Sequence, residues 1–227
     1  MTAGRLHKKS YISMIYIDDK FDFRLDVALR EVSEQRRRKV LRFKKNEGRR
    51  LSVAAYMLLK RSLSDVYGLD CNPCFEYSRN GKPFIKNHPE IYFNISHCPK
   101  AAVCAVGDYP VGVDVEAVRP FKDELARYVL SHDEYEAVVE SGNPEAEFIR
   151  LWTMKESLLK LTGEGIRKDL KTLLGYCNAT ACGYSETNII YNNERIKTGM
   201  TIREFGGVVF STVVFPQYIT TWCSHVR

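Results

Sequence analysis

Long hydrophobic runs are missing from this sequence. None of the apolar segments among its 227 residues approaches the roughly 18 to 20 residues that a membrane-spanning helix needs. The first ten residues are polar and basic and contain no apolar segment of a secretory signal. We therefore expect a cytoplasmic protein that makes no contact with membranes. Since 44% of the residues are hydrophobic, the chain can still bury a substantial core, as one domain or as two halves of about 110 residues.

Cysteine pairs at the spacing of a metal site are scarce as well. The seven cysteines are scattered, and only Cys71 and Cys74 form a C-x-x-C, with no second pair at zinc-finger spacing. A zinc site is therefore disfavoured. An odd number of scattered cysteines is typical of reduced thiols rather than of a disulfide framework.

Acidic residues are too few to balance the basic ones, and the net charge of +6 is unevenly placed. Residues 36–50 contain a dense group of cations, namely Arg36, Arg37, Arg38, Lys39, Arg42, Lys44, Lys45, Arg49 and Arg50. This segment is open to three interpretations: a solvated helical face, a nucleic-acid surface, or a pocket for a small polyphosphate. The lack of interleaved aromatic residues argues against nucleic acid, and the motifs below favour the polyphosphate.

The periodicity of apolar residues predicts helices and strands in both halves of the chain. Amphipathic spacing predicts helices over residues 47–67, 121–130, 131–139 and 145–161. Alternating or β-branched runs predict strands over residues 11–17, 91–95, 101–106, 111–116, 188–191, 195–201, 207–214 and 218–222.

Capping and turn residues support these assignments. Ser131 and Glu134 have the spacing of a capping box, and Gly163 and Gly165 end the last helix. Residues 192–193, both asparagine, predict a hairpin turn. Each half thus has one long helix and several largely antiparallel strands, so we expect an α+β fold with two similar subdomains, residues 1–108 and 109–227.

Two carboxylates stand two residues apart in the run Gly112-Val113-Asp114-Val115-Glu116. On a strand, both would point to the same face. Like charges held this close repel one another unless a cation lies between them. The pattern favours a metal site, although a pair of ordinary strand-end carboxylates is the alternative.

A second motif, Trp152-Thr153-Met154-Lys155-Glu156-Ser157-Leu158-Leu159-Lys160, follows on the last predicted helix. Glu156 and Lys160 share one helix face, where they form either part of a site or a surface salt bridge. Carboxylates from both motifs beside an ammonium are the groups that Mg²⁺ and a phosphate ester need. The two motifs together therefore indicate phosphoryl-type chemistry.

Four motifs in order resemble those of the 4′-phosphopantetheinyl transferases of the surfactin-synthetase-activating (Sfp-like) type. They are Asn80-Gly81-Lys82-Pro83, Phe93-Asn94-Ile95-Ser96-His97, Gly112-Val113-Asp114-Val115-Glu116, and Trp152-x-x-Lys155-Glu156-Ser157-x-x-Lys160. The resemblance covers about residues 36–165. It implies two α+β subdomains related by a pseudo-twofold, with coenzyme A and Mg²⁺ bound between them. A monomer is expected, because one chain then supplies both halves.

The resemblance also implies a role for each matching residue. The metal ligands would be Asp114, Glu116 and Glu156. The residues that hold coenzyme A would be Arg50, Lys82, Ser96, His97, Asp114 and Lys160. Lys160 and His97 would contact the pyrophosphate, and Arg50, Lys82 and Ser96 would hold the nucleotide end. Arg36 and Lys39 match the basic positions upstream.

The implied reaction moves 4′-phosphopantetheine from coenzyme A to a serine of an acyl or peptidyl carrier protein and releases 3′,5′-ADP. Glu156 is the candidate general base, and Lys155 is expected to orient the site or carry a proton. The carrier is expected to dock on residues 119–129, which carry an apolar stripe with basic neighbours.

Two alternatives of other classes stay open. Another Mg²⁺-dependent nucleotide phosphotransferase would need no carrier, but the sequence has no P-loop to support it. A non-enzymatic basic RNA-binding module would need no metal. The acid pair on an apolar-backed strand argues against the RNA-binding alternative.

Overall fold

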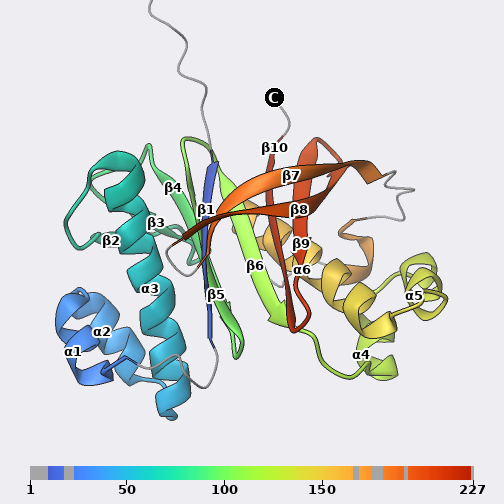
Figure 1. Cartoon of the computed structure of the whole chain (residues 1–227), viewed down its shortest axis with the longest axis horizontal. Coiled ribbons are helices and arrows are strands. Elements are labelled where there is room, and N and C mark those ends of the chain that lie inside the picture. The colour runs from blue at the N-terminus through green and yellow to red at the C-terminus, as the bar shows by residue number, and fades with distance from the viewer. Residues whose placement is uncertain (1–9, 18–22, 166–168, 175–180, 192–193, 226–227) are drawn as a thin grey trace, which may run out of the picture.

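The structure, a computed structural model of the chain, describes residues 10–17, 23–165, 169–174, 181–191 and 194–225. Figure 1 shows one group of helices on each side of a central sheet. The hairpin turn expected at residues 192–193 lies outside the described residues. In the described part of the chain, no helix is long and apolar enough to cross a membrane.

The first half of the chain contributes five strands and three helices. In order they are β1 (Ser10–Tyr16), α1 (Leu25–Glu31), α2 (Glu34–Leu41), α3 (Asn46–Tyr67), β2 (Phe75–Tyr77), β3 (Pro83–Ile85), β4 (Tyr92–Cys98) and β5 (Ala101–Gly107). The long helix expected over residues 47–67 is confirmed as α3, which ends at Gly68 in the left-handed conformation that glycine adopts without strain.

The second half begins with a strand, continues with three helices and ends with four strands. The elements are β6 (Val111–Ala117), α4 (Asp123–Val129), α5 (His132–Val139), α6 (Pro144–Thr162), the 3₁₀ turn η1 (Leu170–Thr172), β7 (Ala181–Tyr191), β8 (Glu194–Phe205), β9 (Val208–Val214) and β10 (Tyr218–His225). The capping box of Ser131 and Glu134 is confirmed at the start of α5. Gly163 ends α6 as expected.

A single eight-stranded sheet joins the two halves, with the order β4-β5-β1-β7-β8-β9-β10-β6. Among the described residues, β1 and β7 pair in parallel over a short stretch and the other neighbours pair antiparallel. Strand β6, at one end of the order, packs back against β4 and β5 at the other. The α+β class is confirmed, whereas the pseudo-twofold and the boundary after residue 108 stay predictions.

Three apolar clusters hold this arrangement together. Helix α3 packs on β4 and β5 through residues such as Leu59 and Phe93. Helix α6 packs on β6 and β10, with Ile149 and Ile219 among the buried residues. A third cluster, which includes Val113, fills the space where strands of the two halves meet. The position of α6 against β6 is therefore fixed by the core.

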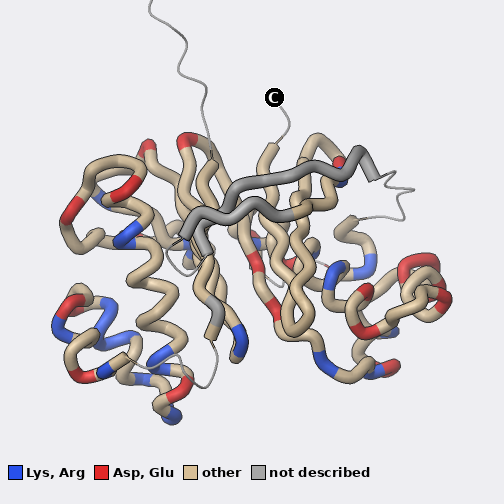
Figure 2. Tube along the Cα trace, in the orientation of Figure 1, with Lys and Arg blue, Asp and Glu red and all other residues tan. Residues whose placement is uncertain are grey.

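The basic segment divides between α2 and the first turns of α3, where Figure 2 shows many of the basic positions. Most of its side chains are exposed, as expected of a solvated face. Arg36 is the exception. Its guanidinium is buried and donates hydrogen bonds of 2.6 and 3.0 Å to the carbonyl oxygen and Oγ of Ser52. The C-x-x-C residues Cys71 and Cys74 are free and exposed.

Candidate active site

Strand β6 and helix α6 come unusually close at Gly112. A Cβ atom at this position would lie 2.0 Å from the carbonyl oxygen of Ser157 and 2.7 Å from the amide nitrogen of Leu161. Only glycine allows the two backbones to approach in this way. The approach brings the acid pair of β6 opposite the acidic and basic positions of α6.

A buried carboxylate forms the centre of the candidate site. Asp114 is 3% exposed, and its Oδ1 accepts hydrogen bonds from Lys160 Nζ at 2.6 Å and from Ser96 Oγ at 2.8 Å. Lys160 also donates to Ser96 Oγ at 2.8 Å. Asp114 lies on β6, Lys160 on α6 and Ser96 on β4. The fold thus brings together three motifs that are far apart in the sequence.

The other two carboxylates lie close enough to Asp114 to respond to its charge. Desolvation raises the pKa of Glu156, and the Asp114 charge raises it further. Desolvation and Asp114 also raise the pKa of Glu116, whereas Arg119, 3.8 Å away, lowers it. The indole of Trp152 lowers the pKa of Glu116 as well, although its N–H makes no regular hydrogen bond to the described residues. The cluster thus holds more negative charge than its cations neutralise.

The donor set fits a divalent cation. Asp114 Oδ2 and Glu156 Oε1 are buried and have no hydrogen-bond partner within the described residues. Hard carboxylate oxygens are the ligands that Mg²⁺ prefers, and a cation would offset both the desolvation of Glu116 and Glu156 and their repulsion by Asp114. Within the described residues, the three carboxylates do not lie close enough together to form a metal-binding group. All three could therefore ligate one cation only after their side chains move.

A cavity of about 310 Å³ opens beside this cluster, between the β2–β3 hairpin and β4 on one side and α6 on the other. Its wall includes both Glu156 and Lys160. Arg36, Lys39 and Lys82 add further cations. The cavity is therefore suited to an anionic ligand that reaches the carboxylates with one end.

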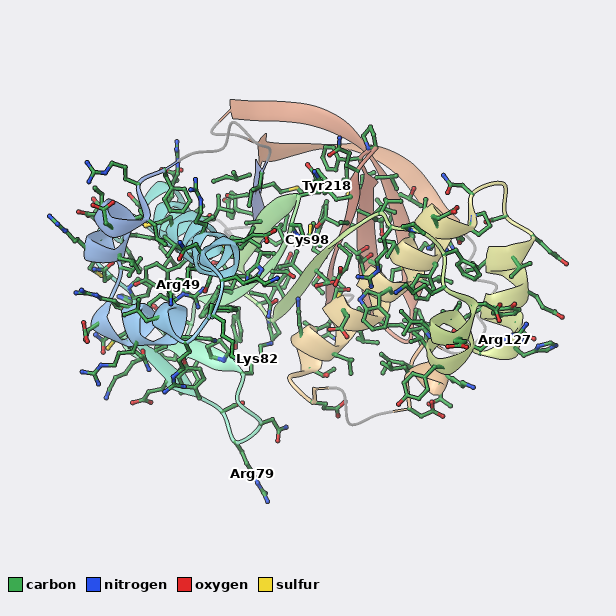
Figure 3. All side chains as sticks on the ribbon, turned by 90° about the horizontal axis from the view of Figure 1, so that it is seen from below. Arg49, Arg79, Lys82, Cys98, Arg127 and Tyr218 are labelled. Atoms are coloured by element: carbon green, nitrogen blue, oxygen red, sulfur yellow. The ribbon has the colours of Figure 1, made fainter. Side chains whose placement is uncertain are left out.

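Lys82 connects the two halves across this cavity. Figure 3, a view from below, shows it between the two groups of helices. Its Nζ donates a hydrogen bond of 2.8 Å to the carbonyl oxygen of Leu161, near the C-terminus of α6. Desolvation lowers the pKa of this ammonium, so an anion in the cavity would be a favourable partner for it.

His97 and Arg50, both expected to hold coenzyme A, do not share the surroundings of Lys82 and Lys160. Desolvation lowers the pKa of His97, and the charges of Arg36 and Lys160 lower it further, so the imidazole is neutral at physiological pH. The Arg50 guanidinium lies over the ring of Phe23, 5.2 Å from its centroid. Among the described residues, the cavity wall includes Arg36 and Lys39 but not Arg50.

Lys155 does not contact the carboxylate cluster in the described structure, and its expected role in orienting the site or carrying a proton stays a prediction. Its side chain leaves α6 on another face, is 1% exposed and donates to Glu134 Oε2 at 2.7 Å. An ammonium enclosed in this way touches no group of the cavity. Sequence reasoning also overlooked Asn94, whose Oδ1 accepts a 3.4 Å hydrogen bond from the backbone amide of Val113 and so ties β4 to β6.

Comparison with known proteins matches both halves of the chain. A model of the 4′-phosphopantetheinyl transferase superfamily matches residues 110–198. A second model, described as 4′-phosphopantetheinyl transferase, N-terminal, matches residues 21–108. The two matched segments together cover most of the residues that build the site.

Several bacterial proteins are similar to this chain. A 4′-phosphopantetheinyl transferase of Bacillus subtilis is 34% identical over 145 residues, which is 62% of this chain and 64% of the relative. The transferase psf-1 of Bacillus pumilus is 35% identical, with 62% of each chain covered. The transferase Sfp of Bacillus subtilis strain 168 is 33% identical, with 60% of this chain and 62% of the relative covered. The chain thus matches less than two thirds of the length of each relative.

Proposed function

This chain belongs to the 4′-phosphopantetheinyl transferase superfamily, and we propose that it transfers 4′-phosphopantetheine from coenzyme A to a serine of an acyl or peptidyl carrier protein, releasing 3′,5′-ADP. The observation that carries the proposal is the convergence of Asp114, Glu156 and Lys160 at the wall of a cationic cavity. One chain supplies all three groups, so a monomer suffices.

The cavity would hold the nucleotide end of coenzyme A. Arg36, Lys39 and Lys82 offer positive charge along its wall, which suits the phosphate groups of this substrate. Lys160 donates to Asp114, and His97 is close enough to Lys160 for that charge to lower the pKa of the imidazole. Both residues would contact the pyrophosphate, and the bond that breaks would then lie beside Glu156.

The residues Asp114, Glu116 and Glu156 would hold the divalent cation. When bound, the cation supplies positive charge that neutralises the phosphoryl oxygens and the leaving 3′,5′-ADP. Lys160 donates to Asp114 in this structure, so binding of the pyrophosphate gives this ammonium a second anionic partner.

Glu156 is the candidate general base. Desolvation and the Asp114 charge raise the pKa of this carboxyl group in the described structure, and a bound cation would lower it again. With Oε1 at the cation, the second oxygen of the Glu156 carboxylate would accept the proton of the carrier serine, directly or through a water. Lys160 shares the helix face and would hold the phosphate in place.

The carrier would dock on α4, the helix that follows β6. The expected apolar stripe divides: Val129 is buried, Phe121 and Leu125 pack partly buried against the same core cluster, and Tyr128 is 74% exposed. Lys122, directly before the first residue of α4, is exposed and supplies positive charge. An exposed aromatic side chain and a cation on the same segment fit an acidic carrier surface.

Transfer is expected to add one phosphopantetheine group to an apo carrier protein, a mass gain of about 340 Da, because the group becomes a serine phosphodiester. Intact-mass measurement of a carrier panel incubated with coenzyme A and Mg²⁺ checks this. Excess EDTA should prevent the gain. Absence of the gain on every apo acyl and peptidyl carrier supplied would overturn the proposed function.

Lys82→Ala is expected to weaken binding of coenzyme A by about 10- to 150-fold, because a charge-assisted hydrogen bond contributes roughly 1.5 to 3 kcal/mol. If Lys82 holds the 3′-phosphate, the affinity for dephospho-coenzyme A should stay at the wild-type value. Isothermal titration calorimetry with both ligands measures the difference.

The matched control is Lys86→Ala on the same hairpin. Lys86 is exposed and pairs with Glu76 at 2.9 Å, outside the cavity, so this variant should bind both ligands normally. An equal loss of affinity for both ligands in Lys82→Ala would show that its ammonium serves another part of the substrate.

A further inference from the structure

The ammonium of Lys155 is the most enclosed cation described outside the carboxylate cluster. It donates three hydrogen bonds: to Glu134 Oε2 at 2.7 Å, to the carbonyl oxygen of Leu170 at 2.6 Å and to that of Val129 at 3.4 Å. An ammonium has three protons, so its hydrogen-bonding capacity is filled. Lys155 therefore has none left for a substrate.

These three acceptors belong to three different elements. Val129 is the last residue of α4, Glu134 lies in the first turn of α5, and Leu170 begins η1. Glu134 Oε2 also accepts the backbone amide of Ser131 at 2.8 Å in the capping box. One side chain of α6 is thus bonded to the end of α4, to the start of α5 and to the turn beyond α6.

The neighbour of Lys155 in the sequence is Glu156, which lies at the cavity. Successive residues on a helix point in directions about 100° apart, so the two side chains diverge from adjacent points of one rigid helix. A displacement of α4 relative to Lys155 is consequently a displacement relative to Glu156. The hydrogen bond from Lys155 to the Val129 carbonyl oxygen links the proposed carrier helix α4 to the helix of the candidate base, and the ion pair with Glu134 links the adjoining helix α5 to it.

Apolar packing alone would define this distance less well. Ala126 and Val129 of α4 share a core cluster with Ile149 of α6, but apolar contacts are not directional and permit small sliding movements. Hydrogen bonds to a buried ammonium restrict both distance and angle. Both partners are almost fully enclosed, so the loss of one alone would leave the other as an uncompensated buried charge.

Building on the proposed function, we propose that Lys155 is a positioning residue for the carrier protein: with Glu134 it holds α4 and α5 at the place where the serine of a docked carrier reaches Glu156. The cavity proposed for coenzyme A lies on another face of α6, and Lys155 and its three acceptors are not part of its wall, so binding of coenzyme A should not depend on this contact. Loss of Lys155 should therefore weaken the use of the carrier protein and leave the use of coenzyme A unchanged.

The test is the double variant Lys155→Met with Glu134→Gln. It leaves no unpaired charge in the interior, and glutamine retains the capping box with Ser131. We expect the KM for the carrier to rise about tenfold, within the range of coupling that such intermediate residues exert. The KM for coenzyme A should change less than twofold. If circular dichroism shows that this variant is unfolded, Lys155→Gln with Glu134→Gln is measured instead, because it also leaves no unpaired charge and its amide can still donate to a carbonyl oxygen; the same split between the two KM values is expected.

The matched control is Arg150→Met with Glu147→Gln. These residues also form an ion pair on α6, and Arg150 is 9% exposed, but both partners belong to this one helix. Its removal should lower stability and leave the KM for the carrier unchanged. The same rise in carrier KM in this control would overturn the positioning role.

The remaining outcomes separate the two proposals. Absence of transfer by the wild-type protein contradicts the proposed function itself. Transfer by the wild type, together with an unchanged carrier KM or an equal rise of both KM values in the test variant, contradicts the positioning role alone.

Discussion

Glu156→Gln is expected to slow transfer by about 10²- to 10⁴-fold, the usual contribution of a general base, and to make the metal-free protein more stable at neutral pH. Desolvation and the charge of Asp114 raise the pKa of Glu156 in the folded state. The ionised carboxylate is therefore less favourable in the folded protein than in the unfolded chain. Glutamine removes this charge and keeps the side chain's shape.

The pH dependence has a definite sign. A carboxyl group whose folded pKa is raised contributes stability below its unfolded pKa, and this contribution is lost as pH rises through the folded pKa. The Tm of Glu156→Gln should accordingly exceed that of the wild type at pH 7.5, and the difference should disappear below the ordinary pKa of 4.5. Thermal unfolding without added metal at the two pH values measures it, with transfer rates from intact mass.

Glu140→Gln is the control for this prediction. Glu140 is exposed at the end of α5, so the variant should retain both activity and Tm. A Glu156→Gln protein with wild-type transfer rates would exclude Glu156 as the base. A lower Tm of Glu156→Gln at pH 7.5 would mean that neighbouring groups stabilise the negative charge of Glu156 in the folded protein.

Gly112→Ala is expected to damage both the fold and the site. The added Cβ would lie 2.0 Å from the Ser157 carbonyl oxygen, and a backbone atom does not move aside as a flexible side chain does. Overpacking of this kind costs about 1–3 kcal/mol and sometimes more. The separation of β6 from α6 would also move Asp114 away from Lys160 and remove most of the activity.

Urea unfolding and transfer assays together test this expectation. Gly142→Ala is the matched control, because nothing lies within 4 Å of a Cβ there. It should retain wild-type stability and rate. If Gly112→Ala has the same stability and transfer rate as Gly142→Ala, the close approach of the β6 and α6 backbones is required for neither.

The elements that the sequence predicted best are those with a strong local signal. The stripe of α3 and the capping box at Ser131 depend on residues close together in the chain, and both are confirmed. Helix α1 was missed because it is short, α2 because most of its residues are charged or polar, and the strands β2 and β3 because each has only three residues. The joining of the halves into one sheet depends on the distant pairing of β1 with β7, which no local pattern indicates.

The candidate site shows the same limit at the level of single residues. The spacing of Asp114 and Glu116 and the shared face of Glu156 and Lys160 follow from strand and helix geometry alone. The contacts of Lys155 do not follow from helix geometry, because the sequence does not indicate which other elements pack against each face of a helix. The role of Gly112 was hidden for the same reason, since the helix that lies against it is some forty residues further along the chain.

The bond between Lys160 and Asp114 has a consequence for the resting protein. A buried carboxylate without a partner is costly, and here the ammonium acts as its counter-ion before any ligand arrives. Under the proposed function, a metal at Asp114 would neutralise this carboxylate, and the charge of Lys160 would then be available to the phosphate. Each ligand would thereby favour the binding of the other.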